Sequence, residues 1–154
     1  MKNSGNLSRI PASEFVLFYA DDDQEDREFF TEALTSIKAD TQLFTHENGD
    51  VLLNALKNPP PQPSIIFLDL NMPVKNGIDV LNDMKDSNEL QNTPVVVFST
   101  SDDRQVIENC KSLGASLFIT KPNSFEGLKK SISHVLSLNW AKPKQQEGPF
   151  HLSF

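Results

Sequence analysis

The sequence is poor in cysteine and contains no long hydrophobic run. Its 154 residues include one cysteine, Cys110, which excludes an intrachain disulfide framework and a cysteine-rich metal site. No apolar run approaches the ~18 residues that a membrane-spanning helix needs, and residues 1–15 lack the apolar centre of a signal peptide. We therefore expect a protein that is neither inserted in a membrane nor secreted by that route, and a cytoplasmic location fits it best.

Basic residues are also in the minority. The chain has 14 lysines and arginines against 21 aspartates and glutamates, which gives a formal net charge of -7. Such a charge repels the phosphates of nucleic acids and of anionic membranes, so we expect neither as a partner. At ~100 to 200 residues per domain, the length suits one domain and leaves no room for a separate DNA-binding or catalytic domain.

The sequence does show a regular alternation of apolar runs and amphipathic segments. Each run is short, and the segment after it places apolar residues at helical spacing, as Phe30, Ala33, Leu34 and Ile37 do. This alternation predicts an α/β fold with a doubly wound, five-stranded parallel sheet and helices on both faces. The predicted strands cover residues 15–19, 41–46, 65–68, 95–98 and 117–119, and the second, which is more polar than the first, is placed at the edge.

The same pattern sets limits for the domain. It predicts an N-terminal extension at 1–13, the domain at 14–140, and a polar tail at 141–154 whose tip from Phe150 to Phe154 is apolar. The last helix is predicted to end at about Trp140 and to turn one stripe of residues inward, namely Phe125, Leu128, Ile132 and Val135.

Reactive side chains stand just after the predicted strands. Asp21 and Asp22 follow the first strand, Asp69 the third, Ser99 the fourth and Lys121 the fifth. The carboxyl ends of parallel strands share one edge of the sheet, where ligands of such folds bind, so we expect these side chains to converge. Three neighbouring carboxylates repel one another unless a cation intervenes, and oxygen ligands favour Mg²⁺, which commonly works beside a phosphoryl group.

Each of these residues also has a simpler interpretation. Asp21 and Asp22 are suited to capping the next helix and to its first turn. Asp69 suits a turn, Lys121 a solvated surface position, and Ser99 a hydroxyl bonded to the nearby backbone. Their joint placement at successive strand ends is what favours a single site.

Four separated segments, by their residues, order and spacing, make the sequence resemble a response regulator receiver domain of two-component signalling. They are YADDDQEDREFF, IIFLDLNMPVKNGIDVL, TPVVVFSTSDD and LGASLFITKP, and the resemblance covers about residues 14–138. It implies a flavodoxin-like fold with strand order 2-1-3-4-5. It also implies a phosphoprotein that signals and is not an enzyme, beyond catalysing its own phosphorylation and dephosphorylation.

The resemblance assigns a role to each acidic residue. Asp69 is the expected phosphoacceptor, taking the phosphoryl group from a phosphohistidine of a sensor histidine kinase or phosphotransfer protein. Asp22 and Asp69 are expected to bind Mg²⁺ directly with the backbone carbonyl of Asn71, while Asp21 acts largely through a metal-bound water.

Further residues are assigned to the phosphoryl group and the switch. Lys121 is expected to pair with the phosphoryl oxygens and to be joined to Pro122 by a bond that is cis in the family. Ser99 donates its hydroxyl to the phosphoryl group, and Phe118 is the aromatic switch residue that turns inward. Thr100 is larger than the alanine or glycine frequent at its position, and we expect it to restrict access to the phosphoryl group.

Output is expected through protein contact. The resemblance points to the face made by the predicted fourth helix from about 103 to 113, the strand at 117–119 and the last helix. This face is expected to mediate homodimerisation or docking on another protein. Segments such as DSNELQNTP also resemble single-domain regulators served by phytochrome-type kinases.

Two other classes of protein fit the residues after the strands less well. A Mg²⁺-dependent phosphatase that uses an aspartyl-phosphate would carry a D-x-D motif after its first strand, whereas here DLN follows the third and supplies no second acid. A flavodoxin-like electron carrier would need a hydroxyl-rich phosphate loop after the first strand, where this chain has DDDQED.

Overall fold

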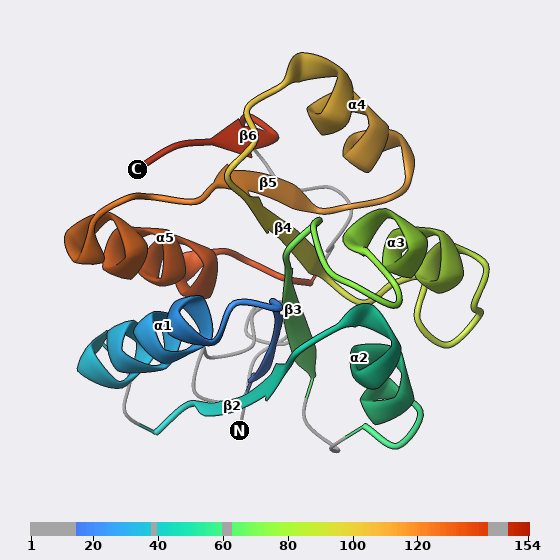
Figure 1. The fold of residues 1–154 in the computed structure, drawn as a ribbon, viewed down its shortest axis with the longest axis horizontal. Helices are drawn as coiled ribbons and strands as arrows, with labels where there is room; N and C mark the ends of the chain where they lie inside the picture. The colour runs from blue at the N-terminus through green and yellow to red at the C-terminus, as the bar shows by residue number, and fades with distance from the viewer. Residues whose placement is uncertain (1–14, 38–39, 60–62, 142–147) are drawn as a thin grey trace, which may run out of the picture.

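The computed structural model describes residues 15–37, 40–59, 63–141 and 148–154, and it shows a single parallel sheet with helices on both faces (Figure 1). The strand order is β2-β1-β3-β4-β5-β6, and every neighbouring pair is parallel. The strands are β1 (Val16–Ala20), β2 (Gln42–His46), β3 (Ser64–Leu68), β4 (Val95–Ser99), β5 (Leu117–Thr120) and β6 (His151–Leu152). The helices are α1 (Gln24–Ile37), α2 (Gly49–Leu56), α3 (Gly77–Lys85), α4 (Arg104–Ser112) and α5 (Phe125–Ser137).

The strands owe their burial to side chains that alternate between two cores. One core joins one face of the sheet to α2, α3 and α4 through residues such as Leu52, Val80 and Cys110. The other joins the opposite face to α1 and α5 through Phe30 and Ile132. Because both faces are covered, the central strands are apolar throughout, and the predicted doubly wound α/β fold is confirmed.

Local signals fix where the helices begin and end. Asn76 and Asp79 form a capping box at the start of α3, and Asp103 caps α4. Gly114 follows α4 with a φ of 95°, the left-handed conformation that glycine adopts without strain. Among the described residues, no helix is long and apolar enough to cross a membrane.

The C-terminal region departs from the prediction in three ways. The sheet has a sixth strand, because residues 151–152 of the predicted tail pair with β5. Helix α5 ends at Ser137, and Trp140 lies beyond it, buried, with its indole N–H donating to the carbonyl of Val135 at 2.8 Å. Phe125 is 40% exposed, because the inner face of α5 begins with Gly127 and not with the first apolar residue of the pattern.

The order β2-β1-β3-β4-β5 places the carboxyl ends of β1 and β3 side by side.

The predicted position of β2 at the edge is confirmed. The predicted N-terminal extension at 1–13 lies outside the described residues, and the domain limits at 14 and 140 stay predictions.

Candidate functional site

Three aspartates meet at the carboxyl edge of the sheet. Asp21 and Asp22 follow β1, Asp69 follows β3, and each offers a carboxylate oxygen within 4.8 Å of the other two. Asp21 and Asp69 are buried, at 1% and 5% exposure, while Asp22 is exposed. The predicted convergence of these three side chains is therefore present in the structure.

Lys121 reaches this cluster from the end of β5. Its Nζ lies 2.6 Å from Asp21 Oδ2, 3.0 Å from Asp26 Oδ2 and 3.6 Å from Asp69 Oδ1. Burial would lower the pKa of Lys121, but its hydrogen bond to Asp21 and the charge of Asp69 outweigh that effect and raise it. The ammonium is therefore fixed in the charged form among the carboxylates.

Asp21 has little bonding capacity left. The hydroxyl of Tyr19 donates to its Oδ2 at 2.5 Å, Lys121 donates to the same oxygen, and the N–H of Asp23 donates to Oδ1 at 2.9 Å. Burial, and next the charge of Asp21, raise the pKa of Tyr19, so its hydroxyl keeps its proton as a donor. This arrangement fits a carboxylate that reaches a cation through water better than one that binds it directly.

The ionisation of Asp69 is strongly perturbed by its surroundings. Its pKa is raised to about 6: burial is the largest cause, Asp21 and Asp22 also raise it, and Lys121 and a hydrogen bond to the backbone of Asn71 partly offset them. Most of Asp69 is ionised at neutral pH, but at a cost in free energy that a nearby cation would relieve.

The donor set fits a hard divalent cation. Carboxylate oxygens are the side-chain ligands that the cluster offers, and Asn71, two residues after Asp69 in the chain, has a backbone carbonyl as a further oxygen ligand. Three carboxylates against one ammonium also leave a negative excess for such an ion to balance. The residues present therefore suit a divalent ion of the Mg²⁺ or Mn²⁺ type and not a soft metal.

Of the three predicted switch residues, Ser99 and Phe118 are fully buried, and Thr100 is exposed. Ser99 accepts a hydrogen bond from the N–H of Ser101 at 3.2 Å, so its hydroxyl is turned to the backbone as the simpler interpretation had it. Its carbonyl accepts from the N–H of Lys121 at 2.7 Å. Phe118 points inward with no exposed surface, and Thr100 is exposed at the end of β4.

One expected feature of this region is wrong. The bond between Lys121 and Pro122 is trans, since the described part of the chain contains no cis peptide bond. Trans is the form that X–Pro bonds favour by about 0.5–1 kcal/mol unless tertiary contacts select the other.

Sequence reasoning missed several members of the site. The apolar run that contains Tyr19 indicates a core aromatic of β1. Tyr19 also lies two residues before Asp21, so both side chains point to the same face and its hydroxyl reaches that carboxylate. By its place in the sequence, Asp26 is one of several acids in the first turn of α1. In the structure it forms an ion pair with Lys121. Arg27 has no sequence signal that links it to the site, yet its guanidinium donates to the carbonyl of Asp21 at 2.6 Å.

The loop between β3 and α3 carries an unusual backbone conformation. Val74 has a φ of 67° and is 81% exposed, although β-branched residues rarely adopt the left-handed region. At the end of the loop, the N–H of Gly77 donates to the carbonyl of Leu70 at 3.0 Å. The loop that follows Asp69 is therefore held at both ends but strained in its middle.

Comparison with known proteins gives a consistent result. The family model described as "Response regulator receiver domain" matches residues 17–133. Response regulator Rcp1 of Synechocystis is 28% identical over 127 residues, which are 79% of this chain and 86% of Rcp1. The protein-glutamate methylesterase of Bacillus subtilis is 34% identical over 105 residues, but these are 67% of this chain and only 28% of that enzyme.

Solved structures agree with the sequence comparison. The Mn²⁺-bound form of Rcp1 superposes with a TM-score of 0.71 at 27% identity, over 79% of this chain and 94% of that one. The phosphorylated cyanobacterial phytochrome response regulator RcpA gives a TM-score of 0.70 at 28% identity, over 77% of this chain and 89% of that one. Similarity along most of the length thus extends to single-domain regulators, while an enzyme such as the methylesterase shares only a part of its length.

Proposed function

The chain belongs to the response regulator receiver family of two-component signalling, and we propose on that basis that Asp69 is its phosphoacceptor. The family is one of signalling domains and not of catalysts, and the chain has a phosphoacceptor signalling role. The observation that carries the assignment to Asp69 is its position: a buried carboxylate between two further aspartates and the ammonium of Lys121.

The phosphoryl donor is a phosphohistidine of a sensor histidine kinase or of a phosphotransfer protein. An oxygen of the ionised Asp69 carboxylate attacks the phosphorus in line, the N–P bond breaks, and its electron pair returns to the imidazole. An aspartate is a weak nucleophile, so the reaction depends on an activated donor and on charge stabilisation at the phosphoryl oxygens. Lys121 supplies part of that stabilisation from the position that its contacts with Asp21 and Asp69 fix.

Mg²⁺ is the cation we assign to the acidic cluster. Asp22, Asp69 and the backbone carbonyl of Asn71 would hold it, with Asp21 behind a metal-bound water. When bound, Mg²⁺ supplies positive charge beside the phosphoryl oxygens and allows Asp69 to remain ionised in its buried position. The solved Mn²⁺-bound form of Rcp1 supports a divalent ion in a related regulator.

Ser99 and Thr100 act on the phosphoryl group from the end of β4. The hydroxyl of Ser99 leaves the N–H of Ser101 and donates to a phosphoryl oxygen, which draws the end of β4 toward Asp69. Thr100 restricts the approach of water and partners, and Phe118 is the aromatic switch that stands inward when this contact is made.

Output proceeds by contact with another protein in the cytoplasm. The face formed by α4, β5 and α5 is the surface we assign to it, for a second copy of the chain or for another protein. The net charge of -7 disfavours nucleic acid, and the similarity to RcpA supports a phytochrome-type kinase as the donor.

Phosphorylation of the purified protein tests the assignment. With Mg²⁺ and a small phosphodonor, the intact mass is expected to rise by one phosphoryl group, and Asp69→Asn is expected to abolish the increase. Asp102→Asn, which removes an exposed carboxylate from the loop after β4, serves as the matched control and should be labelled like the wild type. Equal labelling of the Asp69→Asn variant would refute Asp69 as the phosphoacceptor.

A further inference from the structure

The outer edge of β5 is occupied by the C-terminal segment of the chain. Strand β6 pairs with β5 in a register that sets His151 opposite Phe118, and the N–H of Phe118 donates to the carbonyl of Phe150 at 3.0 Å. Figure 1 shows β6 beside β5, between α4 and α5. The segment therefore covers the middle of the face to which output is assigned.

His151 makes the contact with the switch residue. Its ring stands edge-on to the ring of Phe118, with centroids 5.5 Å apart at 87°, and its Nε2 lies 2.7 Å from Oγ1 of Thr120. Phe118 and Thr120 point to the same face of β5, because they are two residues apart in the strand. Phe118 has no exposed surface, and it can reach solvent at this edge only if His151 moves.

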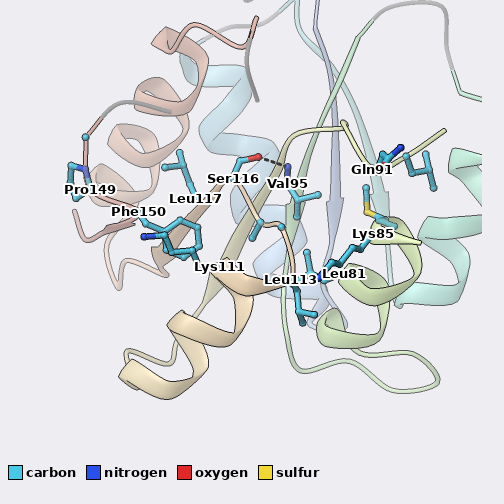
Figure 2. Close-up of a pocket in the computed structure, with 15 residues that line it drawn as sticks. Leu81, Lys85, Gln91, Val95, Lys111, Leu113, Ser116, Leu117, Pro149 and Phe150 are labelled. Atoms are coloured by element: carbon cyan, nitrogen blue, oxygen red, sulfur yellow. Dashed lines mark hydrogen bonds between the residues drawn. The ribbon is translucent and has the colours of Figure 1, made fainter. Parts of the chain in front are cut away.

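The rest of the segment is anchored on both sides of β5. On the α4 side, Phe150 packs against the core, and Lys111 Nζ lies 5.8 Å from the centre of its ring. Figure 2 shows Phe150 and Pro149 along one wall of a cavity of about 460 Å³. On the α5 side, Leu152 packs against the other core.

The end of the segment lies against α5. The ring of Phe154 stands 5.4 Å from that of His134, and a Cβ at Gly127 would lie 3.3 Å from the carbonyl oxygen of Phe154. Yet β6 itself is only two residues long and half-buried. A strand this short at a sheet edge opens at a free energy far below that of global unfolding, so the segment can detach while the domain stays folded.

We propose that β6 is a positioning element of the switch, in which His151 holds Phe118 inward, so that docking of β6 and phosphorylation of Asp69 stabilise the same state. This inference rests on the proposed function. A continuous series of contacts connects His151 to the phosphorylation site. The ring of His151 is hydrogen-bonded to Thr120, and Thr120 pairs with Ser99 in the register of β4 and β5. The carbonyl of Ser99 in turn accepts from the N–H of Lys121. His151 acts through Phe118 and Thr120 and touches no reacting atom.

If docking of β6 and phosphorylation of Asp69 favour the same state, each must strengthen the other by the same factor. A phosphoryl group on Asp69 should tighten the docking of β6, and a weakened β6 should lower the affinity of the site for a phosphoryl mimic by the same factor. Couplings of this kind typically amount to about 5- to 150-fold. A role for β6 confined to general stability would show neither effect.

The test uses the full chain with beryllofluoride and Mg²⁺ as the phosphoryl mimic. Beryllofluoride affinity is measured by titration for the wild type, His151→Ala and Ser153→Ala, the last being an exposed neighbour in the same segment. We expect His151→Ala to weaken binding by about five-fold or more and Ser153→Ala to leave it unchanged. In the wild type, beryllofluoride should slow hydrogen exchange of the Phe118 amide by a similar factor, because this amide is bonded to Phe150.

The outcomes separate the two proposals. If the wild type and Asp69→Asn respond alike to beryllofluoride and neither is phosphorylated, the proposed function fails. If beryllofluoride binds the wild type and His151→Ala equally, or binds the variant more tightly, and exchange at Phe118 does not change, the role of β6 is refuted and the phosphoacceptor stands. The exchange measurement needs no variant, so it decides the matter even if His151→Ala is poorly folded.

Discussion

Lys121 is the residue on which the charge balance of the site depends. It is the cation that contacts both buried aspartates, Asp21 and Asp69. Without it, these two carboxylates, at 1% and 5% exposure, would face each other with no cation between them in the part of the chain that the structure describes. Removal of one partner from a buried ion pair typically costs about 3–5 kcal/mol, because the other charge stays buried and unpaired.

We predict that Lys121→Ala lowers the free energy of unfolding by about 3 kcal/mol in metal-free buffer. Saturating Mg²⁺ should recover part of the loss, since a divalent ion replaces the missing positive charge. Urea denaturation with and without Mg²⁺ measures both effects. Lys130→Ala, which removes an exposed lysine of α5, is the control, and an equal loss in both variants would contradict the prediction.

Val74 offers a stabilising substitution. Its left-handed backbone conformation costs about 1–2 kcal/mol in a residue with a β-branched side chain, and its exposed side chain contributes little packing in return. Val74→Asn should raise the free energy of unfolding by about 1 kcal/mol, because asparagine tolerates this conformation. Thermal denaturation measures it, with Val51→Asn on helix α2 as a control at an ordinary helical position; a gain of the same size there would argue against relief of strain.

Cys110 is expected to be chemically silent. Burial raises the pKa of its thiol to about 11, from a usual value of 9.0, and the side chain has no exposed surface. The thiolate, which is the reactive form, is therefore scarce at pH 8. A thiol reagent should label Cys110 in denaturant and not in the native protein, and fast labelling of the native protein would contradict the burial of this residue.

At the scale of the elements, the loop between β3 and α3 is packed against the backbone that carries Asp69. A Cβ at Gly77 would lie 2.6 Å from the carbonyl oxygen of Asp69 and 2.8 Å from Cα of Leu70. Backbone atoms of a buried strand end cannot move aside as a side chain can. The first residue of α3 is therefore a glycine because of close packing and not because of its dihedral angles.

Gly77→Ala should lower stability by about 2 kcal/mol or more and also weaken Mg²⁺ binding, because it displaces Asp69. Gly114→Ala provides the contrast: its added Cβ meets nothing within 4 Å, but its φ of 95° is strained, so it should cost about 1 kcal/mol and leave Mg²⁺ binding unchanged. Denaturation and calorimetric titration of both variants separate the two causes. Unaltered metal affinity in Gly77→Ala would show that the loop absorbs the clash.

The elements that the sequence predicted are those with a strong repeating pattern. β1, β3, β4 and β5 are apolar runs enclosed by helices, and their pattern reflects burial on both faces, while β2 at the edge is more polar. β6 has no such pattern, because it is two residues long and becomes a strand only when the unpaired edge of β5 is beside it. Helix α5 was predicted too long because Leu138 and Trp140 continue the apolar spacing after the backbone has left the helix, with a ψ of 157° at Leu138.

The residues of the site also divide into those that a sequence pattern predicts and those that it does not. Asp21, Asp22, Asp69 and Lys121 were predicted to converge because strand ends share one edge in a parallel sheet. Tyr19 and Asp26 were not, because the first belongs by pattern to the core and the second to a run of acids. The inward position of Phe118 in contact with His151 depends on a pairing between distant segments, which no local pattern reports.

At the scale of the whole molecule, metal binding and folding are linked. A ligand that binds only the folded state adds RT ln(1 + [L]/Kd) to the free energy of unfolding, about 2.7 kcal/mol at a concentration 100 times the Kd. For a chain of 154 residues, this corresponds to a rise in Tm of several degrees. The size of the rise reports the affinity of the site without any label.

We therefore predict that Mg²⁺ raises the Tm of the wild type in a concentration-dependent way and that Asp22→Asn reduces this rise strongly. In the absence of metal, the same variant should be at least as stable as the wild type, because one of three repelling carboxylates has gone. Asp50→Asn, an exposed acid of α2, should behave like the wild type. A full Mg²⁺ response in Asp22→Asn would argue against direct ligation by this residue.

The position of Trp140 has a consequence for spectroscopy. It is the single tryptophan of the chain and is buried just after α5, the helix that starts at the carboxyl edge of the sheet after β5 and returns to the amino edge before the parallel strand β6. Its emission should be short in wavelength in the folded protein, shift to the red on unfolding, and remain unchanged when a cation binds. The protein thus contains an intrinsic fluorophore that reports its folding separately from the occupancy of its site.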